Sequence, residues 1–125
     1  MKNEFIPYEQ AIALKELGFD EPCFGGYYSN QDNVNLWFFK EAKNSDRDER
    51  VREGFATAPT YSQAFRWFRE KHGLRHFIEY DYGHYNAVVQ SSLVYHCDTH
   101  EEAELACLNR LIILITPITN PQTKP

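Results

Sequence analysis

One short stretch of the chain concentrates side chains that could grip an anion. Guanidinium groups hold carboxylates and phosphates through charge-assisted hydrogen bonds, and an indole ring can stack on a flat ligand. The candidate binding residues are Arg66, Trp67, Arg69, Lys71, Arg75 and His76. These residue types predict a surface that binds phosphate, a nucleotide or an acidic protein. The alternative is a solvated helix face, with Trp67 packed beneath a neighbouring loop.

Charge is unevenly distributed along the sequence. The whole chain has a formal net charge of −5, which disfavours broad nonspecific binding to nucleic acid. Residues 66–76 contain four Lys or Arg against Glu70, a local charge of +3, whereas residues 77–104 contain six carboxylates and no Lys or Arg, a local charge of −6. Such blocks form either solvated faces or a surface that steers a charged partner.

A second group of reactive side chains lies between residues 72 and 84. Its histidines and carboxylates could transfer protons if a hairpin brought them together. They are His72, His76, Glu79, Asp81 and His84. Their spacing does not require such an arrangement, and the chain has no Ser-His-Asp elbow, Walker loop or Glu-x-x-His pair. We therefore expect no catalytic residue with a recognisable signature.

His96 and His100 have the spacing of a zinc-binding pair on a helix. Thr99 and Glu102 form a capping box, however, which puts His96 in a strand and His100 in the first helical turn. The cysteines are odd in number, without Cys-x-x-Cys spacing, at Cys23, Cys97 and Cys107. We therefore expect no metal, no cofactor and no disulfide framework, and a reducing cytoplasmic location.

Clear start and stop signals mark the helix that carries the basic cluster. Thr60 and Gln63 form a capping box, Pro59 blocks an earlier turn, and Gly73 suits the left-handed residue that ends a helix. A helix over 60–73 would bury a stripe and turn Arg66, Arg69 and Glu70 outward, with Trp67 at the stripe's edge. The stripe is Tyr61, Ala64, Phe65, Phe68 and His72.

The rest of the pattern predicts an α+β fold, an antiparallel sheet with helices mainly on one face, in the order α-β-β-(β)-α-β-β-α. Apolar side chains on both faces of the second strand suggest that it is central or covered on both sides. Gly25-Gly26 indicates a bulge or a close backbone approach. The expected helices are 7–17, 60–73 and 100–115, and the expected strands are 23–28, 34–40, 55–57, 75–82 and 85–95.

The length of the chain, 125 residues, predicts a single globular domain over 1–116. We expect a mobile loop over 40–53, which is almost entirely charged, and a disordered tail over 117–125. No apolar run is long enough to span a bilayer, so we expect no membrane partner. Apolar residues nearly encircle helix 100–115, which is therefore either sandwiched within the domain or buried in a homodimer.

Three sequence blocks carry a resemblance to known proteins: residues 19–25 (FDEPCFG), 58–71 (APTYSQAFRWFREK) and 98–104 (DTHEEAE). In these blocks the chain resembles a family of small uncharacterised proteins that recurs in gut bacteria and in their bacteriophages and mobile elements. The doubled Gly25-Gly26 and the charged loop depart from the family. The resemblance implies a context and no activity, namely an accessory protein that acts on a host or phage macromolecule or on a small signal.

These observations support one function hypothesis and two alternatives. The first is a nonenzymatic interaction or regulatory protein that binds an acidic macromolecular surface through helix 60–73. The second is a protein that sequesters a phosphorylated small molecule or nucleotide. The third is a small enzyme that uses histidines and carboxylates near residues 79–84. A flat basic surface would favour the first, whereas a pocket with inward-pointing Arg or Tyr side chains would favour the second.

Overall fold

The structure is a computed structural model that describes residues 2–29, 33–46 and 54–117. Within these ranges, the chain begins with a short 3-10 helix, η1 (Lys2–Glu4), and continues with helices and strands in alternating groups. The elements that follow are α1 (Tyr8–Glu16), β1 (Cys23–Ser29), β2 (Val34–Ala42), β3 (Phe55–Ala58), α2 (Tyr61–His72), β4 (His76–Asp81), β5 (His84–Val89), β6 (Ser92–Cys97) and α3 (His100–Ile115).

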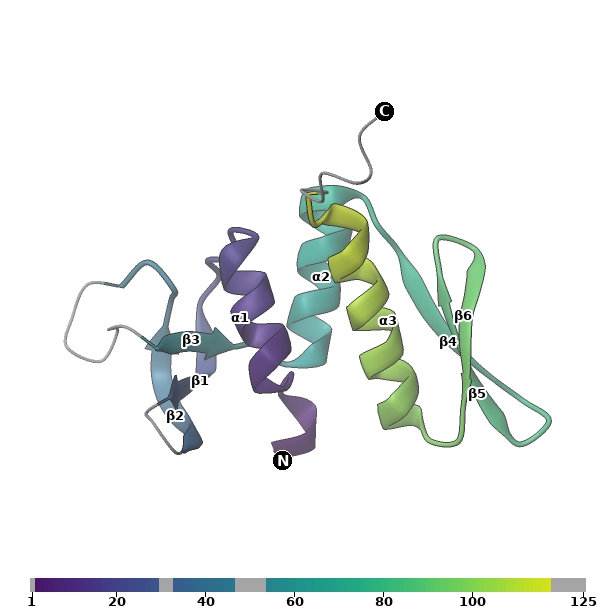
Figure 1. Ribbon diagram of the computed structural model, residues 1–125, viewed down its shortest axis with the longest axis horizontal. Coiled ribbons are helices and arrows are strands. Elements are labelled where there is room, and N and C mark those ends of the chain that lie inside the picture. Colours follow the sequence, from purple (N-terminus) through teal and green to yellow (C-terminus); the bar gives the residue numbers. More distant parts are fainter. Residues whose placement is uncertain (1, 30–32, 47–53, 118–125) are drawn as a thin grey trace, which may run out of the picture.

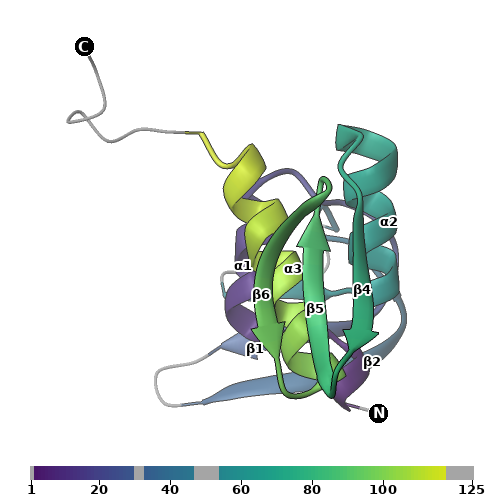
Figure 2. The same cartoon turned by 90° about the vertical axis from the view of Figure 1, so that its right-hand side faces the viewer.

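The elements form three layers, with the helices between two small antiparallel sheets (Figure 1). The first sheet has the order β2-β1-β3 and lies on the α1 side, and the second has the order β4-β5-β6 and packs on α3. Figure 2 looks onto the second sheet, with α3 behind it. The predicted α+β class is confirmed, and each sheet has its helices on one face. The strands, however, divide into two sheets.

The second sheet contains one strand more than the sequence pattern predicted. Segment 85–95 is split into β5 and β6 by a tight turn in which Gln90 and Ser91 have positive φ angles of 53° and 69°. The turn is held to Arg75, whose backbone N–H donates to the Gln90 side chain at 2.7 Å and whose carbonyl accepts from the Gln90 N–H at 2.9 Å. Gly or Asn normally marks such turns, and neither residue occurs here.

The helix start and stop signals are confirmed. Both capping boxes are present, Thr60 with Gln63 at the start of α2 and Thr99 with Glu102 at the start of α3. Gly73 ends α2 in the left-handed conformation, with a φ angle of 67°. The buried stripe of α2 includes Phe65 and Phe68, as predicted, although His72 at its end is exposed.

Helix α3 is covered on both sides within one chain. It packs on β4, β5 and β6 on one side and on α1 and α2 on the other. Its buried side chains are Ala103, Cys107, Leu108 and Leu111. The apolar side chains left exposed, Ile113 and Leu114, lie in its last turns. The sandwiched arrangement is therefore the one observed, and burial of α3 does not require a second subunit. None of the helices in the described part of the chain could cross a membrane.

Strand β2 lies at an edge of its sheet, and the prediction that it is central or covered on both sides is wrong. The central strand is β1, and Trp37 and Phe38 of β2 are each 54% exposed. The reason is that β3 occupies the other side of β1. The prediction of a bulge or a close approach at Gly25-Gly26 is confirmed, because the pairing of β1 with β2 shifts register between Cys23 and Gly25 and a Cβ at Gly25 would lie 3.1 Å from the carbonyl oxygen of Ala58.

The segment predicted as a mobile loop from residue 40 begins with ordered structure. Lys40 and Glu41 belong to β2, and Ala42 at its end is buried. Asn44 then joins β3 to the segment between α1 and β1: its amide donates to the carbonyl of Phe19 at 2.8 Å and accepts from the N–H of Thr57 at 2.9 Å. Residues 47–53 and 118–125 of the predicted loop and tail lie outside the described residues.

Replacing Asn44 by Ala should destabilise the protein by roughly 1–3 kcal/mol, because it leaves a carbonyl and an N–H without partners. Both groups belong to residues that are 1% exposed, Phe19 and Thr57. Urea unfolding measures the change. Asn35→Ala, on the exposed surface of β2, is the control and should cost no more than about 0.5 kcal/mol. Equal effects from the two variants would show that Asn44 is not an anchor.

Candidate functional site

The outward face of α2 presents the basic residues that the sequence singled out. Arg66, Arg69 and Lys71 are exposed on the helix, and Arg75 is exposed in the segment that leads to β4. Within the described part of the chain, none of these four cations has a carboxylate within 4 Å or a side-chain hydrogen bond. Their charge is therefore available to a partner from outside the chain.

Trp67 does not belong to this open surface. It is 6% exposed and packs edge-on against Phe19, with ring centroids 5.4 Å apart, and against Phe68. At 100° per residue its position borders the buried stripe, and the segment that follows α1 closes over it. The prediction that the ring of Trp67 is free to stack on a ligand is therefore wrong. The ring is packed beneath the segment that contains Phe19, as in the alternative interpretation.

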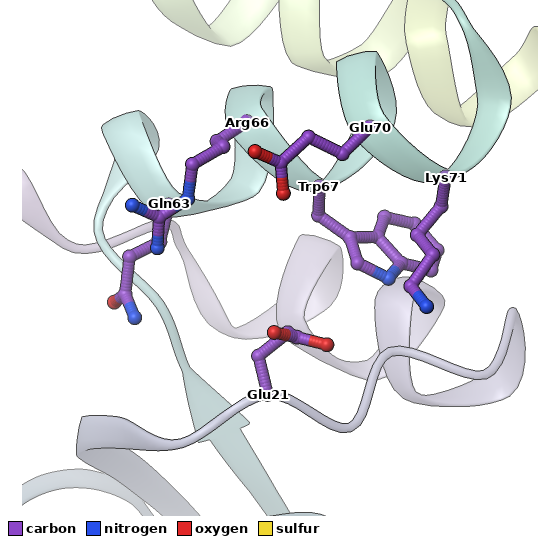
Figure 3. A pocket seen from close by; sticks show the side chains of 6 residues that line it. All are labelled: Glu21, Gln63, Arg66, Trp67, Glu70 and Lys71. Atoms are coloured by element: carbon purple, nitrogen blue, oxygen red, sulfur yellow. The ribbon is translucent and has the colours of Figure 1, made fainter.

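The structure divides four of the five remaining candidates between two hollows, one on each flank of α2, and Arg75 lines neither of them. On the first flank, Arg66, Glu70 and Lys71 of the helix line one hollow together with Glu21, which lies in the segment before β1 (Figure 3). The depression between them is small, about 20 Å³, with Trp67 in its lining. Two cations face two carboxylates here, so this hollow is balanced in charge.

On the other flank an open groove of about 400 Å³ lies between α2, β4 and the first turns of α3. Arg69 and Ser62 line it from α2, His76 from β4, and His100 and Glu104 from α3. The rings of Phe65 and His76 stack in its wall, with centroids 3.7 Å apart. The groove thus brings a guanidinium, two imidazoles, a hydroxyl and a carboxylate to one place.

Sequence reasoning found Arg69 and His76 but missed Ser62, His100 and Glu104. The capping box at Thr99 does place His100 and Glu104 in the first turns of α3. Nothing in the sequence, however, shows that this end of α3 lies beside α2, because that contact depends on how the second sheet folds back over the helices.

Burial perturbs two titratable groups of the groove in opposite directions. Burial and the nearby Arg69 guanidinium lower the pKa of His76, so the neutral ring is favoured. Burial raises the pKa of Glu104, an effect that His100 partly offsets. His100 Nδ1 lies 3.7 Å from a Glu104 carboxylate oxygen. An anion bound next to His76 would favour the protonated imidazole, so binding there would take up a proton.

The pH dependence of stability should report the environment of His76. Because the pKa of His76 is lower in the folded state, the unfolded chain binds more protons between that pKa and the usual value near 6.5, and stability falls as pH falls through this window. His76→Phe keeps a ring against Phe65 and should flatten this slope.

Urea unfolding at several pH values measures how the free energy of unfolding changes with pH. Glu104, whose pKa is raised, contributes to this slope with the opposite sign, and its contribution cancels when wild type is compared with the variant. His84→Phe, at an exposed histidine, is the control. An unchanged slope in His76→Phe would contradict the assignment.

The histidine and carboxylate side chains near residues 79–84, which the enzyme hypothesis would use, lie on an open surface. His84 Nδ1 is 3.8 Å from Asp98, and the two side chains are 54% and 89% exposed. His84 is paired across the hairpin with Asp81, and no wall excludes water from these groups.

The thiols are poor nucleophiles, because burial raises the pKa of Cys23 to about 12 and that of Cys107 to about 11. Among the described residues, no group of three or more His, Cys, Asp or Glu side chains could hold a metal ion.

Comparison of the chain with protein-family models, with curated proteins and with solved structures gives no match.

Proposed function

We propose that this protein is a nonenzymatic interaction or regulatory protein that binds an acidic macromolecular surface through the outward face of α2. The observation that carries the proposal is the set of four cations without a partner in the described part of the chain. A carboxylate of a partner can bond to such a guanidinium without first displacing an internal one. Because α2 is capped at both ends, three of these cations, Arg66, Arg69 and Lys71, stand on a rigid support.

An acidic protein fits this surface better than a nucleic acid does. The chain carries a net charge of −5, and Glu21 and Glu70 stand beside Arg66 and Lys71. A phosphate backbone would meet these carboxylates with repulsion, and the buried Trp67 cannot stack on a base. An accessory role in a phage or mobile element agrees with the family that the three sequence blocks resemble, and this context depends on that resemblance alone.

A second candidate function is the sequestration of a phosphorylated small molecule or nucleotide. The groove beside Arg69 supports it, since a guanidinium, the Ser62 hydroxyl and the His76 ring converge there. Sites for small ligands usually enclose most of the ligand. This groove is open to solvent and also contains Glu104, so the macromolecular partner remains the first proposal.

Reversing the charge of Arg66 and Arg69 together should abolish partner binding and leave the fold intact. Each guanidinium supplies charge-assisted contacts of roughly 1.5–3 kcal/mol, whereas exposed substitutions usually change stability by no more than about 0.5 kcal/mol. Immobilised wild type and Arg66→Glu/Arg69→Glu would be used to capture partners from a lysate of expressing cells. The captured protein would then be purified and titrated against both forms by calorimetry at several salt concentrations.

The control for charge is Arg110→Glu, at an exposed arginine of α3, compared with Arg66→Glu alone. We expect Arg110→Glu to bind like wild type and Arg66→Glu to bind more weakly. Equal binding by wild type and the doubly reversed protein would refute the proposal. Calorimetry with inorganic phosphate and nucleotides tests the second candidate, which predicts binding that depends on Arg69 and His76 and not on Arg66.

A further inference from the structure

Two adjoining hollows lie where α2 and α3 begin, beside the first residues of the chain. Both helices begin at the end of the molecule where η1 lies (Figure 1). The hollows have volumes of about 440 Å³ and about 250 Å³. They share three lining residues, Asn3, Tyr61 and Glu101, and therefore form one recess.

The recess is acidic. Its described lining includes no Lys or Arg and four carboxylates, namely Glu4, Glu101, Glu102 and Glu104. The carboxylate of Glu102 is engaged in the capping box, where it accepts from the N–H groups of Asp98 and Thr99. Within the described part of the chain, the other three have no Lys or Arg within 4 Å, and Glu104 has only His100 beside it. Negative charge is therefore left for a ligand.

The dipole of α3 accounts for only part of this charge. Carboxylates in the first turn offset the positive amino end of a helix, which explains Glu101 and Glu102. It does not explain Glu4, which belongs to η1, or Glu104, whose side chain is 23% exposed. Burial raises the pKa of Glu104, and a cation bound beside this carboxylate would offset the effect.

Tyr61 distinguishes this recess from an ordinary acidic surface. Its side chain lines both hollows and is 7% exposed. Its hydroxyl has no hydrogen-bond partner among the described residues, yet it is not among the polar atoms that are sealed from solvent, so it is open to the recess. Burial and the nearby Glu104 carboxylate raise the pKa of Tyr61 to about 12. The phenol is therefore neutral, and its oxygen can accept a hydrogen bond.

One wall of the recess is apolar and aromatic. Phe5, Tyr27 and Leu105 line the larger hollow together with Tyr61. Phe5 is 8% exposed, and the Tyr27 hydroxyl is held by the carbonyl of Ile6 at 2.7 Å, so both rings are fixed in place. Alkyl groups pack on such a wall, and the faces of aromatic rings attract cations. Among the described residues, no group of carboxylates and histidines could hold a metal ion. The lining therefore suits an organic cation.

We propose that this recess binds a small organic cation of the alkylammonium class. The ammonium lies among the carboxylates outside the capping box and donates a hydrogen bond to the Tyr61 hydroxyl oxygen, and the alkyl group lies against the aromatic wall. The proposal does not rest on the function proposed for α2, because it uses the first turn of that helix and none of its arginines. It gives a role to part of the acidic block 77–104.

Calorimetric titration of the full chain with butylammonium chloride tests the proposal. Butylammonium should bind more tightly than methylammonium, because only the longer alkyl group covers the aromatic wall. The neutral alcohol of the same length, 1-butanol, should not bind, and sodium chloride at the same concentration should not displace butylammonium. In NMR spectra of ¹⁵N-labelled protein, the shifts caused by butylammonium should concentrate on the first turns of α2 and α3.

Two variants test the assigned contacts. Glu101→Gln/Glu104→Gln removes two charges, keeps the capping box, and should weaken butylammonium binding about tenfold or more. Tyr61→Phe keeps the ring and should weaken it about fivefold or more, because the hydroxyl acceptor is lost.

Each variant has a matched control. Glu79→Gln/Asp81→Asn makes the same change in net charge on β4, and Tyr95→Phe removes an exposed hydroxyl from β6. Both should bind butylammonium like wild type. Arg66→Glu should do so too, which separates this proposal from the function proposed for α2. Circular dichroism checks that each variant is folded.

Four results would overturn the proposal. They are no binding of butylammonium by wild type, equal binding of butylammonium and 1-butanol, equal binding of butylammonium and methylammonium, and equal weakening in the two variants with altered carboxylates. Unchanged binding in folded Tyr61→Phe would likewise contradict the assigned hydrogen bond and with it the proposed site.

Discussion

The architecture depends on the need to cover α3 from two directions. Its apolar side chains extend around most of the helix, and a three-stranded sheet can shield only one side. The second sheet packs on one side and α1 and α2 on the other, so the helices become the middle layer. The first sheet then closes the outer side of α1. One continuous core results, with contributions from all three helices and from both sheets.

This arrangement determines what α2 can offer to a partner. Its buried stripe joins the middle layer, and the indole of Trp67 is enclosed by Phe19. Arg66 and Arg69 therefore remain exposed on α2. Arg69 and Glu104 line the same open groove. The local charge of +3 in a chain of net charge −5 is thus exposed on α2 and on the segment that follows it, where it can steer an acidic partner.

The sequence predicted features that depend on local chemistry. Capping boxes, the left-handed Gly73 and the buried Phe68 involve residues a few positions apart, so their rules apply before the fold is known. The position of β2, the turn at Gln90 and Ser91, and the enclosure of Trp67 depend on contacts between distant segments. The six candidate residues of the site were identifiable by type, but the position of Arg69 and His76 beside Glu104 followed only from the packing of α3 against α2. Asn44 gave no signal, because its two partners, Phe19 and Thr57, are distant in sequence.

The central claim is that the outward face of α2 is the contact surface for an acidic partner. An NMR titration of ¹⁵N-labelled protein with the captured partner tests it most directly, because it follows every backbone amide and each arginine Nε at once. The account predicts that the shifted signals concentrate on Arg66, Arg69 and Arg75. Shifts confined to the outer faces of the two sheets, with the α2 signals unmoved, would contradict it.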